Sequence, residues 1–119
     1  MKLGHIELFV RDPTSSLIFY RDMLGCDVVE VQGGGRCVWL KLGELELLLR
    51  KGTHQDAAPA YHMSSVGFVL YTDDLTTRMA ELRNRGVVFV GNDGSEREPT
   101  FVDPDGHWFQ LVNPVDFSV

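Results

Sequence analysis

Residues 103–112 read D-P-D-G-H-W-F-Q-L-V and predict a tight turn followed by a strand. Pro104 presets a φ of about −65°, and Gly106 accepts the positive φ that such a turn requires. Residues 108–112 are apolar except for Gln110, which is typical of a half-buried strand. Because residues 99–102 are a second short strand-like run, the end of the chain predicts two strands joined by a turn.

The segment upstream of this turn predicts a strand, a helix and a further strand. Residues 66–72 have the composition of a strand, and Asp73-Asp74 supplies a helix N-cap. Apolar residues at helical spacing follow, at Leu75, Met79 and Leu82. Gly86 is placed to end the helix, and residues 87–90 then predict another strand. The second half of the chain therefore predicts the order β-α-β-β-β.

The first half of the chain shows the same order. Residues 3–10 predict a strand, Asp12-Pro13 a helix start and Gly25 the end of that helix. Three further strands are predicted at residues 28–31, 37–42 and 45–50. The sequence thus predicts an internal duplication of two tandem βαβββ modules in one α+β domain, residues 1–119. Module one is residues 1–50, the linker residues 51–65 and module two residues 66–119.

Composition excludes several classes of partner. The 119 residues include 11 Lys+Arg and 17 Asp+Glu, a formal net charge of −6, which disfavours nucleic acid. No apolar run approaches the roughly 20 residues of a membrane helix, and the first residues lack the apolar stretch of a signal peptide. We therefore expect a cytoplasmic protein without membrane association. Cys26 and Cys37 fit no metal-binding spacing and are predicted to be free thiols.

Strand alternation assigns aromatic side chains to the sheet faces that the helices leave uncovered. Two sheets with one covered face each are expected to form a ligand cleft from their opposite faces. Side chains of this set would either form the wall of that cleft or belong to the core. Its members are Phe9, Trp39, Tyr71 and Trp108.

Four polar residues are candidates for chemistry on the same faces. His5 is either a metal ligand or a hydrogen-bonded strand histidine, and Glu46 is either a metal ligand or the partner of a cross-strand ion pair. Lys41 would pair with Glu46 or hold an anionic group of a substrate. Gln110 lies between Phe109 and Leu111 and is either a weak ligand or a satisfied core amide.

The tandem β-α-β-β-β order resembles the vicinal oxygen chelate superfamily, which includes glyoxalase I, bleomycin-resistance proteins and extradiol dioxygenases. The motifs that carry the resemblance are H-I-E-L-F-V-R-D-P, F-Y-R-D-M-L-G and D-P-D-G-H-W-F-Q-L-V. They span the whole chain. The same fold carries enzymes and inert binding proteins, so the resemblance alone does not assign a function.

The resemblance implies a metal site at four positions, two in each module. These positions are occupied by His5, Glu46, Gly67 and Gln110. Gly67 has no side chain, and Gln110 offers a neutral amide where the family pattern has a carboxylate. The implied divalent metal is Ni, Zn, Mn or Fe, either weakly bound or absent.

Two specific functions follow as hypotheses, beside a third alternative, a small protein of this superfamily whose ligand is unrelated to either. One is a metal-dependent lyase or isomerase of the glyoxalase type, acting on a small substrate with adjacent oxygens, with Glu46, or alternatively Glu7, as the base. The other is a metal-free protein of the bleomycin-resistance type that binds a planar and often cationic drug. In both, Phe9, Trp39, Lys41, Tyr71 and Trp108 contact the small molecule, and we expect a homodimer.

Overall fold

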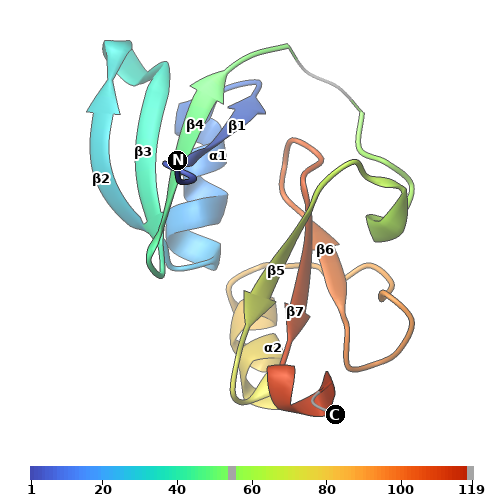
Figure 1. The fold of residues 1–119 in the computed structure, drawn as a ribbon. Coiled ribbons are helices and arrows are strands. Elements are labelled where there is room, and N and C mark those ends of the chain that lie inside the picture. Colours follow the sequence, from blue (N-terminus) through green and yellow to red (C-terminus); the bar gives the residue numbers. More distant parts are fainter. Residues whose placement is uncertain (54–55, 118–119) are drawn as a thin grey trace. The chain divides into compact units, whose positions relative to one another are not determined.

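The computed structural model describes residues 1–53 and 56–117. The chain divides into two compact units, residues 1–55 and 56–119, each with its own sheet (Figure 1). The second unit begins inside the segment that the sequence predicts as a linker, residues 51–65. The α+β fold class that the sequence predicts is confirmed.

The first unit contains a four-stranded sheet with a helix on one face. Its strand order is β1-β4-β3-β2, with β1 parallel to β4 and the other neighbours antiparallel. The predicted strands are confirmed with small shifts of their ends. The elements are β1 (Ile6–Val10), α1 (Pro13–Ile18), the π-helical turn η1 (Phe19–Met23), β2 (Asp27–Gln32), β3 (Cys37–Leu42) and β4 (Leu45–Lys51).

The first helix begins where the sequence predicts. Asp12 is the N-cap, and its carboxylate accepts hydrogen bonds from the backbone N–H of Thr14 at 3.1 Å and from the hydroxyl of Ser15 at 2.9 Å. The helix continues through η1, and Gly25 follows with a φ of 79°. Side chains from this helix and from the facing strands are buried together, namely Leu17, Tyr20, Val38, Leu40, Leu47 and Leu49.

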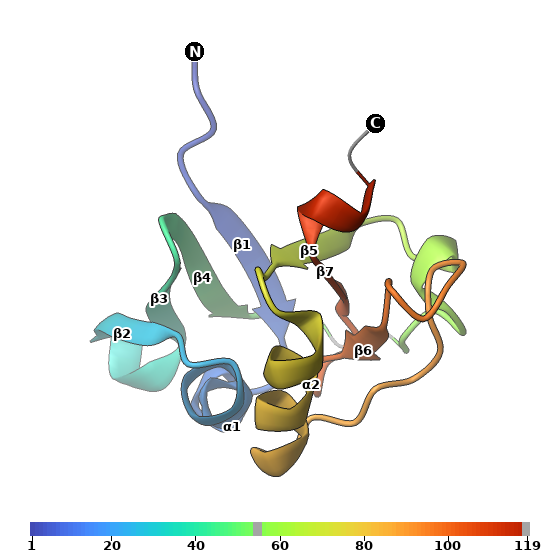
Figure 2. The same ribbon diagram turned by 90° about the horizontal axis from the view of Figure 1, so that it is seen from below.

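The second unit contains a three-stranded sheet in the order β5-β7-β6, in which β7 is parallel to β5 and antiparallel to β6. Figure 2 shows α2 beside this sheet from below. The elements are η3 (Tyr61–Met63), β5 (Gly67–Tyr71), α2 (Leu75–Asn84), β6 (Thr100–Val102), β7 (Trp108–Val112) and η4 (Pro114–Phe117).

One predicted strand is wrong, because residues 87–90 form no strand. They approach β6 through a hydrogen bond from the Val90 N–H to the Thr100 carbonyl at 2.7 Å, and an isolated bridge joins Asn92 to Pro99. Gly91, with a φ of 68°, interrupts the extended backbone directly after this segment. Module two therefore has one strand fewer than module one.

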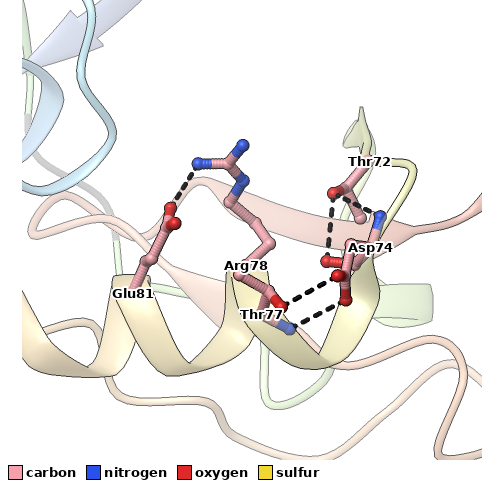
Figure 3. A network of polar contacts seen from close by, with 5 residues as sticks. All are labelled: Thr72, Asp74, Thr77, Arg78 and Glu81. Carbon is pink, nitrogen blue, oxygen red and sulfur yellow. Dashed lines mark hydrogen bonds and ion pairs between the residues drawn. The ribbon is translucent and has the colours of Figure 1, made fainter.

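The N-terminus of α2 is fixed by a local polar network (Figure 3). The Asp74 carboxylate accepts from the backbone N–H of Thr77 at 3.0 Å and from its hydroxyl at 2.8 Å. These two bonds hold the pKa of Asp74 below its ordinary value. One turn further on, Arg78 donates to Glu81. None of the helices in residues 1–53 and 56–117 is long and apolar enough to cross a membrane.

A row of phenylalanine rings forms the core of the second unit. Phe101 and Phe109 stack with centroids 5.2 Å apart and planes 5° from parallel. Phe68 lies 5.2 Å from Phe109, and Phe89 contacts the edge of Phe101 at 5.4 Å. Because Phe101 and Phe109 are almost completely buried, this row joins the strands to the segment after α2.

We predict that Phe109→Ala lowers the free energy of unfolding by about 3–5 kcal/mol, because it removes a ring from the centre of the packed row. Urea unfolding followed by circular dichroism measures the change. Phe117→Ala is the control, since that ring is 46% exposed. Equal losses in the two variants would contradict the packing described here.

Candidate functional site

The face of the first sheet that α1 leaves uncovered is the first candidate surface. The strand register pairs Glu7 with Leu48 and Leu48 with Trp39. The adjacent row pairs Phe9 with Arg50 and Arg50 with Cys37. Strand alternation therefore brings the ring of Phe9 and the indole of Trp39 to one face, as the sequence predicts. We call this surface the open face of the first unit.

A polar chain runs along this open face. Nε2 of His5 lies 3.3 Å from Glu7 Oε2, and Nη1 of Arg50 donates to Glu7 Oε1 at 3.0 Å. The hydrogen bond from Arg50, followed by that from His5, lowers the pKa of Glu7 below its ordinary value. Glu7 is thus an ionised carboxylate shared by two donors. The sequence offers Glu7 only as an alternative base to Glu46, and it does not predict the pairing of Glu7 with Arg50.

Aromatic rings flank the polar chain. The ring of His5 meets Trp39 edge-on, with centroids 4.7 Å apart, and the indole N–H of Trp39 donates to Gln32 Oε1 at 3.1 Å. Phe9 is 52% exposed, and the Arg50 guanidinium lies 5.9 Å from the centre of its ring. This surface offers π-faces close to hydrogen-bonding groups, a combination that suits a planar ligand.

Glu46 and Lys41 lie at the end of the same sheet. They are paired in the β3–β4 register, and both are exposed. His5 and Glu46 each directly precede the paired residues Ile6 and Leu47, so they hold neighbouring positions on parallel strands. The predicted adjacency of His5 and Glu46 is therefore present in the backbone register. The predicted metal-binding and catalytic roles stay predictions.

The uncovered face of the second sheet differs, because much of it is buried. Val69 and Tyr71 on β5 are 46% and 75% exposed, whereas Trp108 and Gln110 on β7 are only 4% and 7% exposed. Alternation places all four on the predicted face. Two segments outside the strands contact Trp108 and Gln110, and neither segment was recognised from the sequence.

The first of these segments is residues 57–63, which we call the strap. Trp108 donates its indole N–H to the Ala58 carbonyl at 2.9 Å. A Cβ placed on Gly106 would lie 2.9 Å from the Cα of Ala57. Farther along the strap, the ring of Tyr61 lies over Gly67. The strap therefore engages the polar atom of Trp108, which the sequence assigns to the ligand wall.

The second segment is the loop before β6. It brings Asp93 to Gln110, whose amide nitrogen donates to Asp93 Oδ2 at 3.2 Å. Gln110 is thus a buried amide with a definite partner, which is one of the two alternatives that its position in the sequence leaves open.

The residues present do not fit the metal site that the family resemblance implies. Gly67 provides no donor, and the Tyr61 ring lies where a side chain at position 67 would project. Gln110 donates its amide nitrogen to Asp93 and has only a neutral amide oxygen to offer a metal. In the described part of the chain, no group of three His, Cys, Asp or Glu residues is arranged to hold a metal ion. His5 and Glu46 alone are too few for a site of this type.

The turn before β7 contains a buried carboxylate–imidazole pair. Asp103 is fully buried, and its carboxylate accepts from the backbone N–H of Asp105 at 2.9 Å and of His107 at 2.8 Å. Nδ1 of His107 lies 2.7 Å from Asp103 Oδ2. Burial lowers the pKa of His107, but the hydrogen bond and charge of Asp103, with the charge of Asp105, outweigh burial and raise it. His107 thus stabilises the turn that positions Trp108.

Comparison with known proteins identifies the family. The family model of the Glyoxalase/Bleomycin resistance protein/Dioxygenase superfamily matches residues 2–111, and the chain belongs to this superfamily. A metapyrocatechase from Pseudomonas sp. (strain CF600) is 28% identical over 99% of this chain. The match spans 39% of that longer protein.

Solved structures confirm the fold. FosX from Listeria monocytogenes, a fosfomycin resistance protein solved with Mn(II) and dihydroxypropylphosphonic acid, superposes with a TM-score of 0.73 at 16% identity. It covers 94% of this chain, which covers 91% of FosX. TnmS3, an antibiotic binding protein from Streptomyces sp. CB03234, is 28% identical with a TM-score of 0.68, over 95% of this chain and 98% of TnmS3. The superfamily relatives thus include resistance proteins and antibiotic-binding proteins.

We predict that His107 makes stability depend on pH. A pKa raised on folding contributes stability that is fully present below the unfolded value, about 6.5, and is lost as pH rises through the folded value. The difference in unfolding free energy between wild type and His107→Ala should therefore shrink from about pH 5.5 to about pH 8.5. Urea titrations across this range measure it, with the exposed His62 replaced by Ala as control. A difference that stays constant with pH would contradict this assignment.

Proposed function

We propose that this chain is a small-molecule-binding protein that takes up a planar aromatic ligand without a metal ion. The observation that carries the proposal is that neither module-two position of the family's metal pattern holds a histidine or a carboxylate. Gly67 has no donor, a Cβ built there would meet the Tyr61 ring, and Gln110, whose amide nitrogen donates to Asp93, has only a neutral amide oxygen to offer. What the family fold retains here is a set of aromatic and polar side chains on the open sheet faces.

The exposed aromatic side chains support a flat ligand. Phe9 is half-exposed, Trp39 has its N–H fixed by Gln32, and Tyr71 projects from β5. A ring held by a neighbouring hydrogen bond loses little conformational freedom when a ligand stacks on it. The similarity to TnmS3 over nearly the whole of both chains supports the same class of function.

Charge favours a cationic ligand. The chain carries a net charge of −6. On the first sheet, Glu7 is already paired with Arg50 and hydrogen-bonded to His5, whereas Glu46 is exposed and forms no ion pair with Lys41 in the part of the chain that the structure describes. Glu46 is the carboxylate we assign to the cation, and Lys41 borders the ligand without binding an anion.

A metal-dependent lyase or isomerase of the glyoxalase type is the alternative. The register that sets His5 beside Glu46 favours it, as does the Mn(II) in the FosX structure. Such an enzyme would use His5, Glu46 and Gln110 as ligands and Glu46 as the base. Module two would give it only the neutral amide oxygen of Gln110, because Gly67 has no side chain, which is why we rank it second.

We further propose that the protein acts in the cytoplasm as a homodimer. Each unit covers one face of its sheet with a single helix, so pairing of chains is an economical way to enclose a ligand. Light scattering in the micromolar range tests the oligomeric state, and a strictly monomeric protein would contradict this part of the proposal.

We predict that EDTA-treated protein binds 9-aminoacridine, a planar cation, and binds the planar anion anthraquinone-2-sulfonate more weakly. The fluorescence anisotropy of 9-aminoacridine measures binding without relying on tryptophan emission. Trp39→Leu should weaken binding by roughly threefold to tenfold, the worth of one aromatic contact.

Phe117→Ala is the control, because it removes a partly exposed aromatic ring that lies outside both sheets. Its affinity should remain that of the wild type. Binding that appears only after a divalent metal is added would contradict the proposal and favour the lyase or isomerase.

A further inference from the structure

We propose that Tyr61 is a ligand-contacting residue that takes over the position of a metal-ligating side chain in module two. This inference rests on the proposed function, because it names an aromatic side chain by which the second unit would contact a planar ligand. It names a residue outside the predicted strands and outside the motifs that carry the family resemblance.

The ring of Tyr61 lies in close contact with Gly67. A Cβ built on Gly67 would lie 2.5 Å from Cζ and 2.9 Å from Cε2 of Tyr61, and would also clash with its hydroxyl oxygen. Nonbonded heavy atoms do not approach so closely, so the phenol ring and a side chain at position 67 cannot occupy their sites together. Tyr61 therefore fills the volume next to the β5 backbone.

Lack of space explains the glycine at position 67. Gly67 lies in the extended strand β5 and does not have the positive φ that favours glycine elsewhere in the chain. The constraint at Gly67 is therefore space and not backbone conformation. A glycine in a strand that admits an aromatic ring marks a close approach between two groups.

Tyr61 is the aromatic side chain beside Gly67 that remains available to a ligand. Trp108 is paired with Gly67 across the strands, but it is buried and bonded to the strap. Tyr61 is only partly buried, and its hydroxyl forms no hydrogen bond to another residue among those described. No described polar side-chain atom is both fully buried and without a partner, so the Tyr61 hydroxyl is not fully buried. Tyr61 thus offers a ring and a free hydroxyl beside β5.

These features define the chemistry of the ligand contact. The phenol ring provides an apolar surface, and its hydroxyl both donates and accepts hydrogen bonds. Val69 and Tyr71 on β5 are exposed, and we call these two residues together with Tyr61 the exposed stripe. We assign to this stripe a planar aromatic ligand with a polar substituent, an amino or oxygen group, at the edge that meets Tyr61.

The experiment measures 9-aminoacridine binding by anisotropy in EDTA for the variants Tyr61→Ala, Tyr61→Phe and Gly67→Ala. Removing the ring should weaken binding by roughly threefold to tenfold. Tyr61→Phe keeps the ring and should lose a smaller part of the affinity. Gly67→Ala leaves Tyr61 in the chain but displaces its ring, so it should weaken binding as much as Tyr61→Ala does.

The double variant Tyr61→Ala/Gly67→Ala identifies the mechanism. Because both single changes act by removing the same ring from the same place, the double variant should bind no more weakly than Tyr61→Ala. Gly4→Ala is the matched glycine control, since a Cβ there would contact nothing within 4 Å. Met63→Ala is the control within η3, because Met63 is 59% exposed.

Two results would overturn parts of the account, and they are distinguishable. If the wild type binds 9-aminoacridine and all Tyr61 and Gly67 variants bind it equally well, Tyr61 is not a ligand contact, while the proposed function stands. If the wild type binds neither 9-aminoacridine nor anthraquinone-2-sulfonate in EDTA, the proposed function fails and the role of Tyr61 fails with it. Thermal unfolding of each variant verifies that the protein is folded in every measurement.

Discussion

Each unit of this protein buries one face of its sheet against an α-helix, and that helix does not cover the other face. In the first unit that second face carries Glu7, Phe9, Trp39 and Arg50 in two cross-strand rows. Strand alternation requires this segregation once Leu8 and Val10 are buried beneath the helix. The placement of functional groups thus follows from the demand for one apolar core in each unit.

The two units solve the same problem with different chemistry. In the first, a polar chain of His5, Glu7 and Arg50 lies among aromatic rings. Phe9 packs closely on Gly52, because a Cβ built on that glycine would lie only 2.8 Å from the Cβ of Phe9. In the second, the strap puts Tyr61 on Gly67. A close approach of an aromatic side chain to a glycine thus occurs in both units, and in the second it underlies the role that we propose for Tyr61.

Much of the fold could be predicted from the sequence, and less of the site. Apolar spacing and the caps at Asp12 and Asp74 located both helices, and the repeated order revealed the duplication. The prediction of a strand at residues 87–90 was wrong, because the β-propensity of these residues does not account for Gly91, which interrupts the extended backbone directly after them. Tyr61 and Asp93 were missed because loop segments carry no periodicity, although Gly67 within a strand was a signal of close approach.

The central claim is that the family scaffold operates here without its metal. Titration of Mn²⁺ into EDTA-treated, dialysed protein, followed by electron paramagnetic resonance, tests it directly, because binding removes the sharp six-line signal of the free ion. The account predicts a signal that rises with total Mn²⁺ as it does in buffer. The account would be contradicted if the free-ion signal stayed absent until one equivalent of Mn²⁺ per chain had been added, and if His5→Ala and Glu46→Gln each restored the signal.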